Sequence, residues 1–236
     1  MVSPVLQRPV LHWLLPMSGF SRSPKLIKGG IVLLDASSGK PLRVIALQYN
    51  PEKLTRSLQA QFVEAGGQNR SEALRLTGPP IETIQLEATI DATDFLEKPD
   101  QNRVATQSGI HPQLCALESM IYPHSTKLEV AYSNQSLGML EIAPMEAPLS
   151  VFVWGKSRIA PVRLTEYRVN EEFFDTELNP IRAQVSLGMR VLSVSDLGHG
   201  HIGGNLYMTY QKAKEQLADQ FAGGDIRALG IGGIPV

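Results

Sequence analysis

The sequence predicts a mainly β protein with one short covering helix and a second helix near its C-terminal end. Residues 181–191 alternate strictly, with apolar side chains at odd positions and polar or small ones at even positions. Residues 84–91 alternate in the same way, and the apolar run at 148–155 is closed by glycine. Because a period of two places alternate side chains on opposite faces of a strand, each strand should have one buried face.

Residues 161–192 predict two strands joined by a turn. The second strand keeps one phase, but the first changes phase: Val162 and Leu164 are apolar in one phase, and Tyr167, Val169 and Phe173 in the other. A slip of one residue near 165–166 would produce this change, which predicts a β-bulge there. The turn is predicted at 175–180, because Asp and Asn side chains bond to nearby amides and Pro180 fixes its own φ.

The remaining elements follow from apolar spacing and from turn residues. A hairpin is predicted with strands at 31–34 and 42–49 around a turn at 35–41, followed by a weaker strand at 52–62. Polar, glycine- or proline-containing stretches predict a mobile loop at 64–71, an extended loop at 91–109 and a loop at 195–204. Helical spacing predicts one helix at 113–122, with Leu114, Leu117 and Ile121 on one face, and another from an Asn205 cap to about Phe221, with Leu206, Tyr210, Ala213, Leu217 and Phe221 on one face.

These elements divide the chain into three parts. Residues 1–28 form an extended N-terminal arm, residues 29–194 the β domain, and residues 195–236 a C-terminal helix with a flexible, glycine-rich tail. The tail combines five glycines with aliphatic residues and cannot fold alone, so we expect it to become ordered against a partner.

The composition limits where the protein can be located and which kinds of partner it can bind. The 236 residues include 22 basic and 23 acidic ones, for a net charge of −1, so no whole-chain field attracts nucleic acid. No run approaches the ~20 apolar residues of a membrane-spanning helix, and Pro4, Pro9 and Pro16 interrupt the apolar leader, which disfavours a signal peptide. We therefore expect a cytoplasmic protein without direct membrane insertion. The single cysteine, Cys115, excludes an internal disulfide and is predicted to be a buried packing residue.

Candidate chemical groups are few and lack the partners that catalysis needs. His199 and His201 could be a metal pair, but zinc sites need three or four ligands. Asp91 and Asp94 could act as acid and base, but such residues commonly end a strand by bonding to turn amides. The acidic cluster of Glu171, Glu172 and Asp175 is interpreted as a solvated rim, and the glycine-rich stretch at 200–204 lacks the lysine of a phosphate loop. We therefore predict no catalytic, cofactor-binding or metal-binding residue, no cofactor and a non-enzymatic role.

Five short motifs resemble, in order, those of contractile injection system tube-initiator and baseplate proteins. The run 47–54 resembles a Q-F-N-P-E signature, and it is followed by 76–78, by 91–94 at the end of a predicted strand, by Pro148 with 153–155, and by 174–183. The last resembles the family's F-d-x-x-G-x-P-x-R-A element before an alternating strand. The motifs cover residues 31 to about 192, which is most of the chain.

The resemblance implies a tube-like β-barrel or two packed antiparallel sheets. It also implies a homo-hexameric ring between the spike or hub and the baseplate below and the inner tube protein above. Neighbouring copies would pair strands edge to edge and initiate the tube inside a phage tail-like particle. Two sets of polar residues would line the lumen or simply face solvent: Gln85, Glu87 and Thr89, or Arg182, Gln184 and Ser186. Relatives often carry a C-terminal LysM-like module, so a helix and tail there favour an adaptor or tube-initiating layer.

Two alternatives come from other classes of protein. The first is a monomeric β-rich module that binds a small molecule or a glycan through the loop at 91–109, since loops of this length are commonly functional. The second is a hydrolase that uses Asp91, Asp94 or the histidines. An enclosed pocket in a monomer would favour the first. Replacing the residues of the second, one at a time, should leave particle assembly unchanged if the chain forms a ring.

Overall fold

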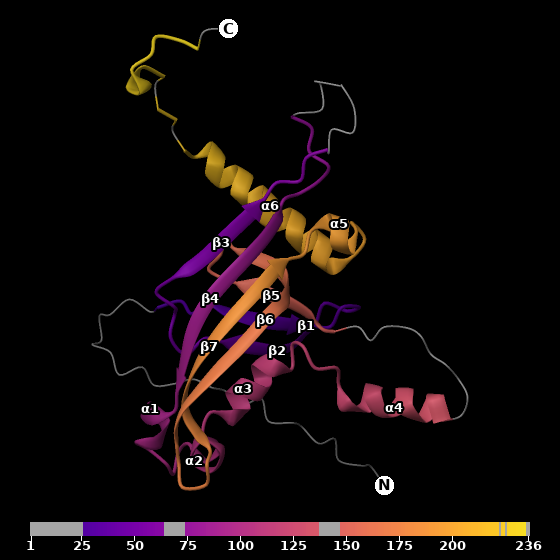
Figure 1. Cartoon of the computed structure of the whole chain (residues 1–236), viewed down its shortest axis with the longest axis vertical. Coiled ribbons are helices and arrows are strands. Elements are labelled where there is room, and N and C mark those ends of the chain that lie inside the picture. Colours follow the sequence, from indigo (N-terminus) through magenta and orange to yellow (C-terminus); the bar gives the residue numbers. More distant parts are fainter. Residues whose placement is uncertain (1–25, 64–73, 137–146, 222, 225, 235–236) are drawn as a thin grey trace, which may run out of the picture.

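The structure is a computed structural model that describes residues 26–63, 74–136, 147–221, 223–224 and 226–234. Most of the predicted N-terminal arm and the whole of the loop predicted at 64–71 therefore lie outside the described residues. The described chain is mainly β, as the alternation predicted, and its strands and helices are arranged as Figure 1 shows.

Seven strands form one antiparallel sheet in the order β2-β1-β5-β6-β7-β4-β3. Their bounds are β1 Gly30–Leu34, β2 Pro41–Ala46, β3 Leu54–Gln59, β4 Ile81–Asp91, β5 Leu149–Val153, β6 Ile159–Phe174 and β7 Pro180–Val191. All seven coincide with strands that the sequence predicted. The sheet is open rather than closed into a barrel, because β2 and β3 end the order and do not pair with each other in the described chain.

The predicted β-bulge is present in β6 and divides its length into two parts. The register between β6 and β7 shifts between Leu164 and Glu166. Before the bulge, β6 also pairs with β5, but that pairing stops at Val162. From residue 163 to residue 174 β6 pairs only with β7 among the described residues, so its other edge is unpaired. We call residues 163–174 the free β6 edge.

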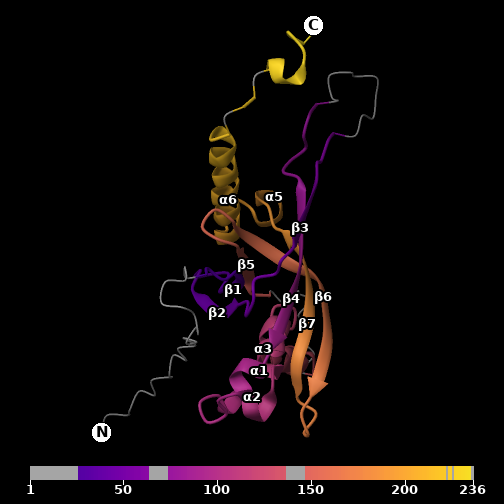
Figure 2. The same cartoon turned by 90° about the vertical axis from the view of Figure 1, so that its left-hand side faces the viewer.

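The core lies on one side of the long strands. Ala183, Val185, Leu187 and Met189 of β7 are buried, and they face Ile90, Ala88, Leu86 and Ile84 of β4 in register. Figure 2 shows β1, β2, the helices α1 to α3 and α6 on that same side, with the opposite side of β6 and β7 uncovered. The strict alternation of β4 and β7 therefore has the meaning the sequence suggested, with one buried face and one open face.

The prediction of an extended loop at 91–109 is wrong, because two short helices lie in this stretch. They are α1 (Thr93–Leu96) and α2 (Arg103–Ser108). Each helix buries one apolar side chain in the core, Phe95 and Ala105. Asn102 ties them together, since its Nδ2 donates to the carbonyl oxygen of Phe95 at 3.1 Å.

The covering helix is α3 (His111–Glu118), and it buries Leu114 and Leu117 as predicted. Ile121 lies beyond the helix end and is exposed, while Met120 is buried in its place. Cys115 is exposed, so the prediction that it packs in the core is wrong. One residue is about 100° around a helix, which turns Cys115 away from the buried stripe of its neighbours.

The next helix, α4 (Ser125–Ser136), lies where the sequence predicted no element, and none of its residues is buried. The prediction of a loop at 195–204 is wrong at both ends, because each end belongs to a helix. Its start is α5 (Val194–Leu197), which has a capping box formed by Ser193 and Asp196. Its end already belongs to the C-terminal helix.

The C-terminal helix, α6 (Ile202–Asp219), begins three residues before the predicted cap Asn205. His201 is the N-cap, and its Nδ1 accepts from the Gly203 amide at 3.0 Å. Tyr207 and Tyr210 are buried, but Leu217 and Phe221 are exposed, because the helix runs beyond the sheet (Figure 1). The tail includes the short 3-10 helix η2 (Ile226–Leu229), which buries no residue.

Candidate functional site

The candidate functional site is the open face and the two free edges of the long-strand layer β6-β7-β4-β3. The two polar sets that the sequence offered as lumen candidates lie on the same face, because they are paired across β4 and β7. Gln85 is opposite Gly188, Glu87 opposite Ser186 and Thr89 opposite Gln184. Directly opposed side chains in antiparallel strands point to one face, so both sets belong to a single polar surface.

Strand β6 extends this polar face and gives it charges of both signs. Its residues Arg168, Asn170 and Glu172 are opposite Ser186, Gln184 and Arg182. Arg168 Nη2 lies 3.2 Å from Glu166 Oε1, and Arg182 Nε lies 3.7 Å from Glu172 Oε2. The first pair is exposed and the second partly exposed, so each adds little to folding stability. The face is therefore a solvated surface of mixed charge rather than part of the core.

The layer ends in two edges, one at β3 and the other along the free β6 edge. Each edge presents unpaired backbone amides and carbonyls, which can pair with a strand of another chain. Neighbouring strands in the layer are antiparallel, so β3 runs in the direction opposite to β6. A β3 strand placed beside the free β6 edge of a second copy would therefore continue the antiparallel pattern.

The β3 edge is fastened to the body by Glu82 of β4, whose side chain is 3 % exposed. Arg56 Nε of β3 lies 2.8 Å from Glu82 Oε1, and Tyr210 OH of α6 donates to the same oxygen at 2.8 Å. Lys214 Nζ lies 3.3 Å from Glu82 Oε2. One buried carboxylate thus joins two strands and the C-terminal helix. We call Arg56, Glu82, Tyr210 and Lys214 the Glu82 cluster.

The Glu82 cluster was not predicted from the sequence, although the sequence contains a pattern that indicates its ion pair. Glu82 falls in the same phase as the buried Ile84 and Leu86, and Arg56 falls in the phase of Leu54 and Leu58. Opposite charges at apolar positions of two predicted neighbouring strands indicate a buried ion pair, since a lone buried charge is very costly. The helix residues Tyr210 and Lys214 could not be added without the three-dimensional arrangement.

Replacing Tyr210 by phenylalanine should weaken the fold and reduce its sensitivity to alkali. Burial, and then the bond to Glu82, raises the pKa of Tyr210 to about 12. Between pH 10 and 12 the unfolded tyrosine loses its proton while the folded one keeps it, so the free energy of unfolding falls as pH rises. Tyr210→Phe should cost about 2 kcal/mol at pH 7, the value of a hydrogen bond to a charged group.

Urea unfolding at pH 8 and at pH 11 checks this prediction. The loss of stability between the two pH values should be smaller in Tyr210→Phe than in the parent protein. It should not vanish, because burial also raises the pKa of Tyr167 to about 12. An equal loss in both proteins would contradict the prediction.

Three of the four aspartates and histidines that the sequence singled out have structural contacts. Asp91 Oδ1 accepts from the Thr93 amide at 2.8 Å, so it ends β4 by bonding to a turn amide, and Asp94 Oδ2 accepts from Tyr49 OH at 3.1 Å. His201 caps α6, and His199 is exposed. In the described part of the chain no three His, Cys, Asp or Glu residues are grouped as metal ligands.

The acidic cluster at the β6–β7 turn is also divided between two roles. Glu172 pairs with Arg182, whereas Asp175 holds the turn, because its Oδ1 accepts from the Glu177 and Asn179 amides at 2.8 Å each. The side-chain amide of Asn179, whose Nδ2 donates to Asp175 Oδ2 at 2.8 Å, and then these backbone bonds lower the pKa of Asp175. The recognition loop that the ligand-binding alternative required is instead α1 and α2, packed on the core. Among the described helices, none is long and apolar enough to cross a membrane.

Comparison with known proteins adds one finding to this geometry. A family model described as contractile injection system tube protein matches residues 31–192, which is more than half of the 236 residues. The matched range begins inside β1 and ends just after β7, so it contains essentially the whole sheet and α1 to α4. No curated protein gives a significant match to the chain.

Proposed function

Because the chain belongs to the contractile injection system tube protein family, we propose that it is a non-enzymatic subunit of a homo-hexameric ring. The ring links the spike or hub of the baseplate to the inner tube and initiates assembly of that tube. Its subunits are made in the cytoplasm and become part of a phage tail-like particle. The observation that supports this proposal best is the pair of unlike free edges on the long-strand layer.

In the proposed ring, β3 of each copy pairs with the free β6 edge of the next copy. The contact joins two different surfaces, and such a heterologous contact produces a ring when the rotation between copies closes. Pairing satisfies the backbone groups that each edge exposes in the single chain. The near-neutral charge of −1 adds little repulsion between copies.

The polar face then lines the lumen of the ring. This face is the solvated side of the layer, and it includes the cross-strand row of Glu87, Ser186 and Arg168. The other side of the layer is apolar core. Closing the layer on itself with the core outward leaves only this face for the interior. A lumen with charges of both signs lets polar cargo pass without holding one sign of charge strongly.

Replacing Leu58 of β3 by lysine tests the ring. Leu58 is 49 % exposed, so Leu58→Lys should leave the folded subunit intact while it puts a charge at the edge that the next copy covers. We expect at least a tenfold lower ring fraction at a concentration where the parent protein assembles. The measurement is mass photometry of the purified protein, alone and mixed with the inner tube protein.

Leu42→Lys on β2 is the matched control. Leu42 is also an exposed leucine on an edge strand, 60 % exposed, but the proposed ring does not use that edge. The control should assemble like the parent. A parent protein that stays strictly monomeric and never enters particles would refute the ring, and so would a control that fails where Leu58→Lys assembles.

A further inference from the structure

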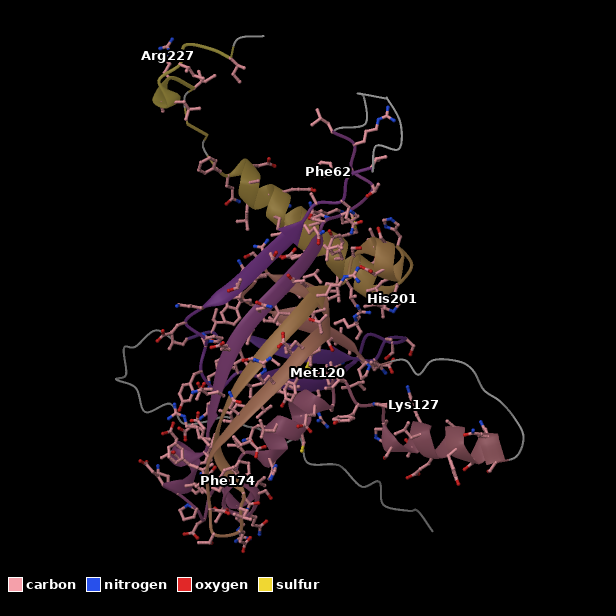
Figure 3. All side chains as sticks on the ribbon, viewed as in Figure 1. Phe62, Met120, Lys127, Phe174, His201 and Arg227 are labelled. Carbon is pink, nitrogen blue, oxygen red and sulfur yellow. The ribbon has the colours of Figure 1, made fainter. Side chains whose placement is uncertain are left out.

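Helix α4 leaves its large apolar side chains exposed in the described chain. None of its twelve residues is buried, and Leu128 and Tyr132 are 49 % and 75 % exposed. Figure 1 shows α4 standing away from the sheet, and Figure 3 places Lys127 at the end nearer to the body. A helix of this length is only marginally stable in water without a surface to pack on. The exposed apolar residues of α4 are therefore available for a contact with another chain.

Leu128 and Tyr132, two of the exposed apolar residues of α4, share one face, and the third, Val130, lies on the opposite face. Leu128 and Tyr132 are four residues apart, so they are neighbours on the helix surface. Thr126 and Ser133 lie about a quarter turn or more away from both of them, on polar surface. The face is small, which suits an auxiliary contact inside a larger interface rather than an interface by itself.

The position of α4 indicates which molecule this face meets. The helix starts on the core side of the sheet, because Lys127 in its first turn lines a hollow together with Asp35, Ser37 and Leu42 of the β1–β2 hairpin. It extends on the side of the molecule opposite to β3 (Figure 1). A copy whose β3 lies along the free β6 edge would occupy that side.

The incoming edge also offers an apolar group on the matching side. Leu58 is opposite Glu82 in the β3–β4 register, and Glu82 is buried on the core side of the layer. Leu58 therefore faces the core side of the edge strand, and it is nevertheless half-exposed in the single chain. Covering it with Leu128 and Tyr132 would remove apolar surface of both copies from water.

We propose that α4 is a clasp that packs, through Leu128 and Tyr132, on the core side of β3 of the neighbouring copy. This inference rests on the ring proposed above and specifies a second contact in it, beside the strand pairing. It also assigns Leu58 two roles at once, as part of the paired edge and as part of the surface that α4 covers. The occupant of the α4 face is thus a second copy of this chain.

Hydrogen–deuterium exchange of the full chain, as monomer and as purified ring, tests the clasp. Amides in residues 129–136 should exchange in the monomer nearly as fast as in an unfolded chain, and on the order of 100-fold more slowly in the ring. The double variant L128E/Y132E should either fail to form rings or form rings in which α4 exchanges fast. The control T126E/S133E adds the same charge away from that face and should keep both the ring and the slow exchange.

The possible outcomes distinguish failure of the α4 contact from failure of the proposed ring. A parent protein that forms no ring refutes the proposed function. A parent ring in which α4 exchanges as fast as in the monomer, or a monomer in which α4 is already protected, overturns the clasp alone. Rings of L128E/Y132E with a protected α4 would also overturn it, as would loss of protection in the control, because the effect would then come from charge on the helix and not from the contact.

Discussion

Replacing Glu82 by alanine is expected to lower the free energy of unfolding by about 4 kcal/mol, because it removes at once the acceptor of the Tyr210 hydroxyl and the counter-charge of Arg56 and Lys214. Tyr210 loses the partner of a buried hydroxyl, and Arg56 and Lys214 keep charges at the margin of the core without a counter-charge. The side chains of both cations are about a quarter exposed, so water relieves part of the cost. Guanidinium unfolding followed by circular dichroism measures the change.

Glu172→Ala is the control for this prediction. It deletes a carboxylate from a partly exposed pair, in which Arg182 Nε is 3.7 Å away, so it should cost less than about 1 kcal/mol. A cost for Glu82→Ala that is no larger than the cost for Glu172→Ala would show that the Glu82 cluster does not fasten the β3 edge. Proteolysis near β3 should also become faster in Glu82→Ala, because the edge strand and α6 are released together.

Replacing Gly109 by alanine is expected to cost about 3 kcal/mol, the second large effect. Gly109 follows α2 with φ at 55° and ψ at −130°, a conformation that side chains rarely adopt. An added Cβ would also lie only 2.1 Å from the carbonyl oxygen of Pro180, which accepts from the Ile110 amide at 2.9 Å. The substitution therefore pushes α2 and α3 away from the start of β7.

Gly200→Ala is the matched control, since a Cβ there meets nothing within 4 Å and its φ is not in the left-handed range. Its free energy of unfolding should change by less than about 0.5 kcal/mol. Thermal unfolding of both variants beside the parent protein measures the difference. Equal melting temperatures for Gly109→Ala and the parent would show that the α2–α3 corner adapts to the side chain.

The strands could be predicted because a half-buried sheet imposes a period of two on the sequence. The bulge in β6 was visible as a change of phase between Leu164 and Tyr167, and the structure places the register shift in that interval. The polar sets of β4 and β7 were also visible, but their cross-strand pairing was not. Alternation shows which face a side chain occupies, and it does not show which strand lies beside it.

The helices were harder to predict, for reasons that differ from one to the next. The helices α1 and α2, of four and six residues, are too short to show a helical period. In α4 the apolar residues Leu128, Val130 and Tyr132 are two apart, which fits a strand as well as a helix. The start of α6 has Gly203 and Gly204, which suggest a loop. Gly204 is needed there because a Cβ would lie 2.0 Å from the carbonyl oxygen of Gly198.

Because the two edges of the long-strand layer differ, any ring built by pairing them is polar, with two different faces. Phe174 at the β6–β7 turn and Phe62 beyond β3 lie at opposite ends of the molecule (Figure 3). When β3 of one copy meets β6 of the next, every copy points the same way, so the two mouths of the ring differ chemically. A tube that starts on one mouth cannot start in the same way on the other, and the polarity of the whole shaft is then set by its first layer.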